Sequence, residues 1–258
     1  SATMEGRSQV AIEAARKAAS SIPADAWREV PLLHQFLVTP LFAYTRFGEW
    51  DLVLNEPRPP EDSLFWTGVW YYARGLAYVA TGKPDEANLE LNRLRETAAH
   101  DSLVDYRVTF SRNGAKAILD IATEVLAGEL SAKRGDYDNA IARLHRAILL
   151  EDNLIYNEPP DWHVPVRQSL GAVLLSAGRA DEAEAIYWQD LERNRENGWS
   201  LFGLLQSLRA QGKAEQAAAV EKRFRKAWKR ADVTLTASRL MDDAHATVAA
   251  TGTILSGN

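Results

Sequence analysis

The sequence predicts an all-α protein built from repeated helix-turn-helix units, and three observations predict this class. Most of the 258 residues fall in Ala-rich and Leu-rich segments whose apolar positions recur with helical spacing. A glycine followed five positions later by a small residue recurs along the chain, as in Gly135 with Ala140. A second glycine precedes several of these by seven positions, as Gly128 precedes Gly135. The pattern predicts pairs of helices that cross closely and are joined by tight glycine turns.

The units follow one another from the N-terminus to about residue 230. Their turns are expected at six glycines: Gly6, Gly48, Gly82, Gly135, Gly178 and Gly212. Glycine suits these positions because it adopts a positive φ without the strain that other residues suffer. Large apolar residues such as Leu144 and Tyr187 are expected to fill the space between the helices of a pair.

Several units depart from the simple pattern. Gly6 lies so near the start that the first unit lacks most of its first helix. A repeat cannot bury its apolar face alone, so we expect either that the chain continues a longer superhelix or that another element covers this end. The prolines of residues 55–60 are expected to end the second helix of the next unit early. Residues 100–113 form the largest insertion, before a helix expected to begin near Ala115.

A different pattern follows the last repeat. The sequence ADVTLTASRLMDDAHATVAA, residues 231–250, predicts one more helix. A terminal unit of a helical stack needs a cover for its outer face, so we interpret this helix as a C-terminal cap. Residues 251–258 are expected to form a flexible, frayed tail.

The unit WYYARGLAYVATGKPDEANLELNRL, residues 70–94, has small, glycine, tyrosine and alanine residues in register. It resembles the tetratricopeptide repeat, whose period of 34 residues equals the spacing from Gly48 to Gly82 and from Gly178 to Gly212. The resemblance covers residues 1–230 and implies a right-handed α-α superhelix. It also implies a concave groove lined by the first helix of each unit. Most such proteins use this surface to bind peptides or proteins.

Two longer stretches carry a closer resemblance. EPPDWHVPVRQSLGAVLLSAGRADEAEAIY, residues 158–187, and NGWSLFGLLQSLRAQGK, residues 197–213, are similar to a widespread, functionally uncharacterised group of bacterial tetratricopeptide-repeat proteins. This chain is similar to their C-terminal half. Their N-terminal half carries His-rich motifs that this chain does not contain. The resemblance therefore sharpens the fold prediction and adds little about function.

The repeat resemblance also implies which side chains face the groove. The candidate peptide-binding residues are Tyr72, Glu129, Gln168, Trp199, Phe202, Gln206 and Arg209. The last four lie on one helix face, and aromatic and arginine side chains are frequent anchors in interfaces. The alternative is that Trp199 and Phe202 pack beneath the C-terminal helix and have only a structural role.

The stretch YNEPPDWHVPVR, residues 156–167, differs from the helices around it. Its prolines and Asp161 suit a helix boundary, where proline stops the preceding helix and Asp caps the next. Five other residues are candidate ligand contacts at the mouth of the groove: Tyr156, Glu158, Trp162, His163 and Arg167. The structural alternative is that Tyr and Trp hold the loop down while Arg167 pairs with Glu158.

Composition limits the classes of function. The formal charge of −5 gives no overall attraction to nucleic acid or to an anionic membrane. The absence of cysteine is typical of a reducing compartment such as the cytoplasm, although it leaves the compartment open. No apolar run is long enough for a membrane span. We predict no catalytic residue set, cofactor or metal, because no nucleotide, nucleophile or His-pair motif appears.

The leading hypothesis is therefore a non-enzymatic scaffold that binds a protein or peptide partner in the groove. The alternative is half of a small-molecule or metal site, in an enzyme completed by an absent N-terminal half, to which the loop of residues 156–167 contributes. A closed groove with convergent buried polar groups would favour that site, and an open groove would favour peptide binding. A third alternative is a homodimer through the exposed apolar face of the N-terminal half repeat.

Overall fold

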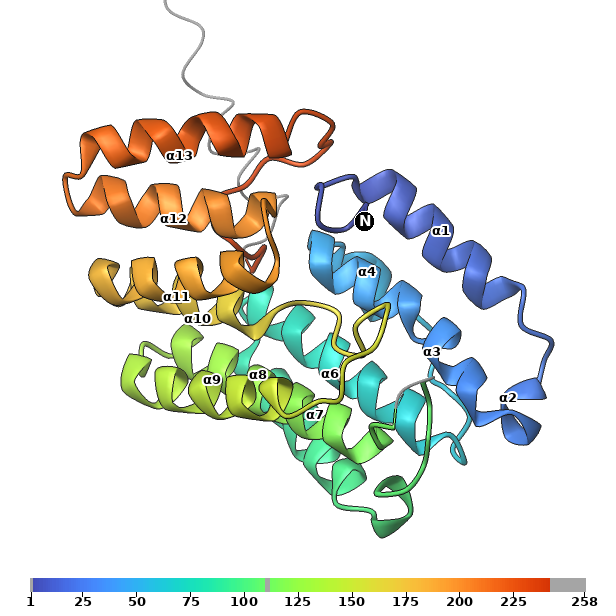
Figure 1. The fold of residues 1–258 in the computed structure, drawn as a ribbon. Coiled ribbons are helices and arrows are strands. Elements are labelled where there is room, and N and C mark those ends of the chain that lie inside the picture. Colours follow the sequence, from blue (N-terminus) through green and yellow to red (C-terminus); the bar gives the residue numbers. More distant parts are fainter. Residues whose placement is uncertain (1, 110–111, 242–258) are drawn as a thin grey trace, which may run out of the picture.

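The computed structural model describes residues 2–109 and 112–241, and it is all-α (Figure 1). No strand occurs within these residues, so the predicted all-α class is confirmed. The α-helices are α1 (Ser8–Ser20), α2 (Ala26–Glu29), α3 (His34–Leu37), α4 (Thr39–Phe47), α5 (Trp50–Asn55), α6 (Leu64–Ala80), α7 (Pro84–Ala98), α8 (Ala115–Lys133), α9 (Tyr137–Asp152), α10 (Val166–Ser176), α11 (Ala180–Arg193), α12 (Gly198–Ala210) and α13 (Ala214–Ala227). Two 3-10 helices, η1 (Pro31–Leu33) and η2 (Asp101–Leu103), accompany them.

The helices from α6 onward pack in neighbouring pairs: α6 with α7, α8 with α9, α10 with α11, and α12 with α13. Each pair stacks on the next, as Figure 1 shows. The first helices of successive pairs contact one another, α6 with α8, α8 with α10 and α10 with α12. We call the surface formed by α6, α8, α10 and α12 the inner face.

Glycines produce the tight turns and the close helix crossings of these pairs. The six turn glycines anticipated from the sequence all have positive φ, between 70° and 79°. Helical glycines act differently, because they make room for a large neighbour. A Cβ atom on Gly171 or Gly203 would lie only 2.4 or 2.2 Å from the ring of Tyr187. Tyr187 is therefore packed between α10 and α12, and neither position accommodates a side chain without movement.

The N-terminal helices turn back toward the end of the stack. Helix α1 packs on α3 and α4, and α4 packs on α6. The turn before α1 meets the last pair, where Gly6 lies against Trp228 and the Trp199 Nε1–H donates to the Thr3 carbonyl over 2.9 Å. The Asp232 carboxylate accepts the backbone N–H of Ser8. The chain's own last pair thus covers this end, which is one of the two arrangements expected.

The homodimer hypothesis requires an exposed apolar face on α1, and part of that face is buried. Ala11 and Ala15, on the apolar face of α1, are buried inside the chain. Ala11 belongs to a small core cluster with Phe47, Trp199 and Leu235, which joins the N-terminal helices to the last pair. These two residues are therefore covered within the chain, whereas Val10 of the same helix is exposed.

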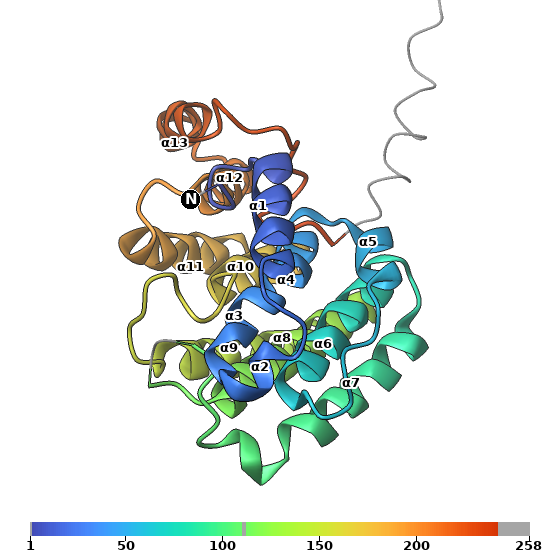
Figure 2. The ribbon, with the colours of Figure 1, turned by 90° about the vertical axis from the view of Figure 1, so that its right-hand side faces the viewer.

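The predicted C-terminal cap over residues 231–250 also needs correction. Residues 231–241, the C-terminal segment, contain no helix. The remainder of the expected cap and the expected tail, residues 251–258, lie outside the described residues. The segment leaves α13 and runs along the inner face between α12 and α4 (Figures 1 and 2). Its residue Leu235 is buried, and Leu240 packs beside Gly48. Apolar anchors and specific hydrogen bonds thus hold a non-helical segment, with bends over residues 236–239, where a helix was expected.

Candidate functional site

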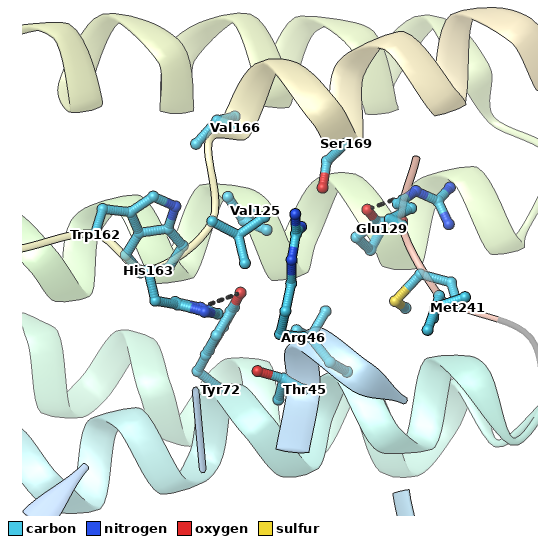
Figure 3. Close-up of a pocket in the computed structure, with 14 residues that line it drawn as sticks. Thr45, Arg46, Tyr72, Val125, Glu129, Trp162, His163, Val166, Ser169 and Met241 are labelled. Carbon is cyan, nitrogen blue, oxygen red and sulfur yellow. Dashed lines mark hydrogen bonds and ion pairs between the residues drawn. The ribbon is translucent and has the colours of Figure 1, made fainter. Parts of the chain in front are cut away.

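A small cavity of about 40 Å³ lies between the inner face, α4 and the C-terminal segment (Figure 3). Its lining combines buried polar groups with aliphatic side chains. The lining residues are Thr45, Arg46, Tyr72, Leu76, Val125, Glu129, Trp162, His163, Val164, Val166, Ser169, Arg239, Leu240 and Met241. They come from α4, α6, α8, α10, the loop before α10 and the C-terminal segment. The cavity therefore joins parts of the chain that are far apart in sequence.

Arg46 on α4 is the central charged group of the cavity. Its side chain is only 5% exposed, and its guanidinium lies over the Trp199 ring, 3.6 Å from the centroid. Within the described residues the guanidinium makes no hydrogen bond or ion pair, and Nη2 is shielded from solvent. Burial lowers the pKa of Arg46 to about 9, while the charge of Asp190 opposes that change. Arg46 is thus a cation at neutral pH, with hydrogen-bonding capacity unused.

An aromatic cluster forms one side of the cavity. The His163 ring stacks on Phe42 with centroids 4.1 Å apart, and Trp162 packs against Tyr72 at 5.4 Å. His163 Nε2 lies 3.4 Å from the Tyr72 hydroxyl, the contact drawn in Figure 3. Burial, and secondly the charge of Arg46, lowers the pKa of His163 to about 3. Burial raises the pKa of Tyr72. Both groups are therefore neutral at physiological pH.

An ion pair closes the opposite side. Arg239 of the C-terminal segment lies 3.0 Å from the carboxylate of Glu129 on α8. Burial raises the pKa of Glu129, whereas Arg239 and a hydrogen bond from Ser169 lower it. Because Arg239 balances the charge of Glu129, this carboxylate attracts Arg46 only weakly. Figure 3 shows Arg46 between this ion pair and the aromatic cluster.

A buried polar network lies behind the cavity, around Asp190 on α11. Its Oδ2 accepts from Gln168 and Asn197, each at 3.2 Å, and from the Ser200 hydroxyl at 2.5 Å. Its Oδ1 accepts from Asn194 at 2.9 Å. Asp190 therefore attracts Arg46 through space while its oxygens are already hydrogen-bonded to neutral groups.

The seven predicted groove residues divide into three groups. Tyr72 and Glu129 line the cavity, and Gln168 lies beside it in the Asp190 network. Gln206 contacts the C-terminal segment, donating from Nε2 to the Thr236 carbonyl over 3.0 Å. Of the remaining three residues, two pack in the interior and one lies at the surface. Trp199 is fully buried under Arg46, Phe202 packs on Phe224, and exposed Arg209 pairs with Glu221 at 2.9 Å.

The five predicted loop residues do not come together. Trp162 and His163 point into the cavity, as described. Tyr156 is 81% exposed and donates to Glu158, its partner at the loop tip. Arg167 points away and binds Asp152 through two hydrogen bonds of 2.8 and 2.7 Å. The suggested pairing of Arg167 with Glu158 is therefore wrong, and Arg167 anchors the start of α10 to the end of α9.

Sequence reasoning did not select Arg46, Asp190, Ser169 or Arg239 as site residues. Arg46 interrupts the apolar run LFAYTRF just before Gly48, and a charge in such a run is a usable signal of a buried polar site. Arg239 carried no such signal, because residues 231–250 were expected to form a helix. Its role depends on the non-helical path of the C-terminal segment.

Comparison with known proteins identifies no relative: no family model, curated protein or solved structure matches the chain. Within the described residues no helix is both long and apolar enough to cross a membrane. The same part of the chain contains no cluster of three or more metal-ligating His, Asp or Glu side chains. Interpretation of the site therefore depends on its geometry.

Proposed function

We propose that this protein is a non-enzymatic scaffold whose inner face is the concave groove of a right-handed superhelix of tetratricopeptide-like units. The groove binds an extended segment of a protein or peptide partner. The observation that carries the proposal is the position of the C-terminal segment, a non-helical stretch that lies along the inner face. It occupies the surface on which a peptide partner would bind. Because the segment also closes the groove over convergent buried polar groups, the small-molecule alternative is supported as well.

The contacts of the segment are those of a recognised peptide. Gln206 donates to the Thr236 backbone carbonyl, a contact that does not depend on the side chain of the bound residue. Ser238 is recognised twice, because its hydroxyl donates to the Gln168 carbonyl over 2.7 Å and lies 2.8 Å from the Tyr187 hydroxyl. Backbone contacts supply affinity, and side-chain pockets supply selectivity.

These contacts define the chemistry of a partner. Glu129 receives a cationic side chain, and the position before it receives a small hydroxyl. The next position is aliphatic, since Leu240 packs beside Gly48. We therefore expect a partner segment with Ser or Thr, then Arg or Lys, then an aliphatic residue. Such a segment binds only when it replaces the chain's own C-terminal segment.

The test uses the full chain and a fluorescein-labelled peptide of residues 231–241, with binding followed by anisotropy. In the wild-type protein the tethered segment competes at a high effective concentration, so binding of the peptide should be weak. A chain carrying Ser238→Ala and Arg239→Met releases its own segment more easily. It should bind the wild-type peptide at least about tenfold more tightly, because less of the groove is occupied.

The control is a peptide of the same composition in scrambled order. Adding Glu129→Gln to the weakened chain should lower affinity for the wild-type peptide and leave the scrambled peptide unaffected. Equal binding of both peptides, or no gain in the weakened chain, would show that the inner face does not recognise extended segments.

A further inference from the structure

The cavity presents a buried cation without a matching acceptor. A charged group removed from water is costly unless hydrogen bonds or an opposite charge compensate it. The Trp199 ring supports one face of the Arg46 guanidinium, which offsets part of this cost. The Nη2 donor, however, is shielded from solvent and has no acceptor among the described residues. The site therefore has a built-in capacity to bind an acceptor that the chain does not supply.

The acceptors near Arg46 are already engaged elsewhere. The Thr45 hydroxyl donates to the Phe42 carbonyl, and Glu129 is paired with Arg239. The Asp190 carboxylate accepts hydrogen bonds from four neutral donors and does not line the cavity.

Four further polar atoms of the lining are buried without a hydrogen bond. Two of them, Glu129 Oε1 and Arg239 Nε, face each other in the ion pair at 3.0 Å. The other two are the indole Nε1 of Trp162 and the imidazole Nδ1 of His163. The indole N–H only donates. When the Tyr72 hydroxyl donates to His163 Nε2, Nδ1 carries the proton of the neutral ring and donates as well. Apart from Glu129 Oε1, whose charge Arg239 balances, the buried lining atoms without a hydrogen bond are donors, which suits an anion.

The net charge of the lining and the volume of the cavity limit which anions the cavity could bind. Arg46 and Arg239 against Glu129 leave one excess positive charge on the lining, which a monoanion neutralises and a dianion overcompensates. A cavity of about 40 Å³ holds roughly three water molecules, so only a molecule of a few heavy atoms fits. Much of the wall is aliphatic, with Leu76, Val125 and Leu240 among its residues. This wall suits a short hydrocarbon chain.

We propose that the cavity binds a short aliphatic monocarboxylate of two or three carbons. Its carboxylate accepts hydrogen bonds from the Arg46 guanidinium, whose planar donors match two carboxylate oxygens. Its hydrocarbon chain packs on Val125 and Leu76. Because Arg239, Leu240 and Met241 form one wall, the ligand also contacts the C-terminal segment. The site does not depend on the groove binding a peptide partner.

The test measures thermal unfolding of the full chain against increasing sodium propionate. Propionate should raise Tm saturably, by on the order of 2–4 °C. Three solutes serve as comparisons: neutral propionamide of the same shape, and sodium chloride and sodium phosphate at matched ionic strength. None of them should reproduce the shift. Titration calorimetry with propionate should give a dissociation constant in the same range as the thermal curve.

Variants locate the site. Arg46→Gln should weaken propionate binding at least tenfold, and Arg225→Gln, in an exposed pair on α13, should leave it unchanged. Val125→Leu fills part of the cavity without altering charge and should also weaken binding, so it tests the site even if Arg46→Gln does not fold. An equal effect of chloride or propionamide, no saturable effect of propionate, or unchanged binding in folded Arg46→Gln or Val125→Leu protein would overturn the proposal.

Discussion

Arg239 and Glu129 form an ion pair between the C-terminal segment and α8, with 3.0 Å between the partly buried guanidinium and the buried carboxylate. The pair fixes the segment at the middle of the inner face. Removing one partner of such an ion pair is destabilising, because the other charge is then left poorly solvated and uncompensated. The docking of the segment should therefore be sensitive to loss of either residue.

We expect Arg239→Met to loosen the C-terminal segment without unfolding the stack. The Glu129 carboxyl, whose pKa burial already raises, takes up a proton more readily when Arg239 is absent. Backbone amides of the segment should then exchange hydrogen at least about tenfold faster, the factor that corresponds to 1.4 kcal/mol. Hydrogen exchange measured by mass spectrometry gives this directly. Arg225→Met, which removes an exposed pair with Glu221, is the control and should leave the segment unchanged.

Tyr187 between its two glycines gives a second prediction. Gly171→Ala gains up to about 1 kcal/mol in helix propensity, but its Cβ would meet the Tyr187 ring at 2.4 Å. Overpacking of a core costs about 1–3 kcal/mol, and the clash is with a fully buried ring, so we expect a net loss of stability. Urea unfolding monitored by circular dichroism measures the change.

The matched experiment repeats Gly171→Ala in a Tyr187→Leu background. There the shorter side chain leaves room, so alanine should be neutral or stabilising. The difference between the two backgrounds is the interaction energy of the pair. An identical loss of stability in both backgrounds would mean that Tyr187 is not the residue that requires glycine at this position.

The helices and their turns could be predicted because their causes are local. Gly135 and Gly178 need positive φ, and the prolines after Asn55 end α5, whatever the rest of the chain does. The site could not be predicted in the same way. Trp162 and His163 were selected for their chemistry, but their partners Arg46 and Arg239 come from α4 and the C-terminal segment. The sequence of residues 231–250 predicted a helix, whereas tertiary contacts of Leu235, Ser238 and Arg239 favour a non-helical path over residues 231–241.

The lowered pKa of His163 predicts a pH-dependent stability. In the unfolded chain the imidazole takes up a proton near pH 6.5, whereas in the folded protein it does so only near pH 3. Between these values the unfolded state binds more protons, so the contribution of His163 to stability is lost as pH falls from 6.5 toward 3. The slope is at most about 1.4 kcal/mol per pH unit, and less where solvent reaches the partly exposed residue.

His163→Phe isolates this contribution. Phenylalanine keeps the stack on Phe42 and cannot titrate, while Arg46, Tyr72, Glu129 and Arg239 around the cavity stay the same in both proteins. The unfolding free energy of wild type minus that of the variant should therefore decrease steadily from pH 7 to pH 4. Urea unfolding at several pH values provides the measurement. A difference that does not change with pH would show that the imidazole is solvated well enough to keep an ordinary pKa.

The last prediction concerns Asp190, whose two carboxylate oxygens accept different numbers of hydrogen bonds. Oδ2 accepts three hydrogen bonds and Oδ1 accepts one, from Asn194. Asp190→Asn must place an NH2 group at one of these two positions. Fewer hydrogen bonds are lost when the NH2 group takes the Oδ1 position, where only Asn194 donates. Even there the new NH2 group faces the Asn194 NH2 group, and both groups are donors. One hydrogen bond to a charged acceptor is therefore lost. That loss costs about 1.5–3 kcal/mol.

The substitution also removes the negative charge that favours the Arg46 cation, so the destabilisation should not fall below this range. Urea unfolding of Asp190→Asn can be compared with Asp105→Asn, a change at an exposed aspartate that pairs only loosely with Arg107 at 3.9 Å. Asp105→Asn should alter stability by less than about 0.5 kcal/mol. If the two variants were equally stable, the Asp190 network would not contribute to the fold, and Arg46 would lie in its cavity without the support that the geometry assigns to Asp190.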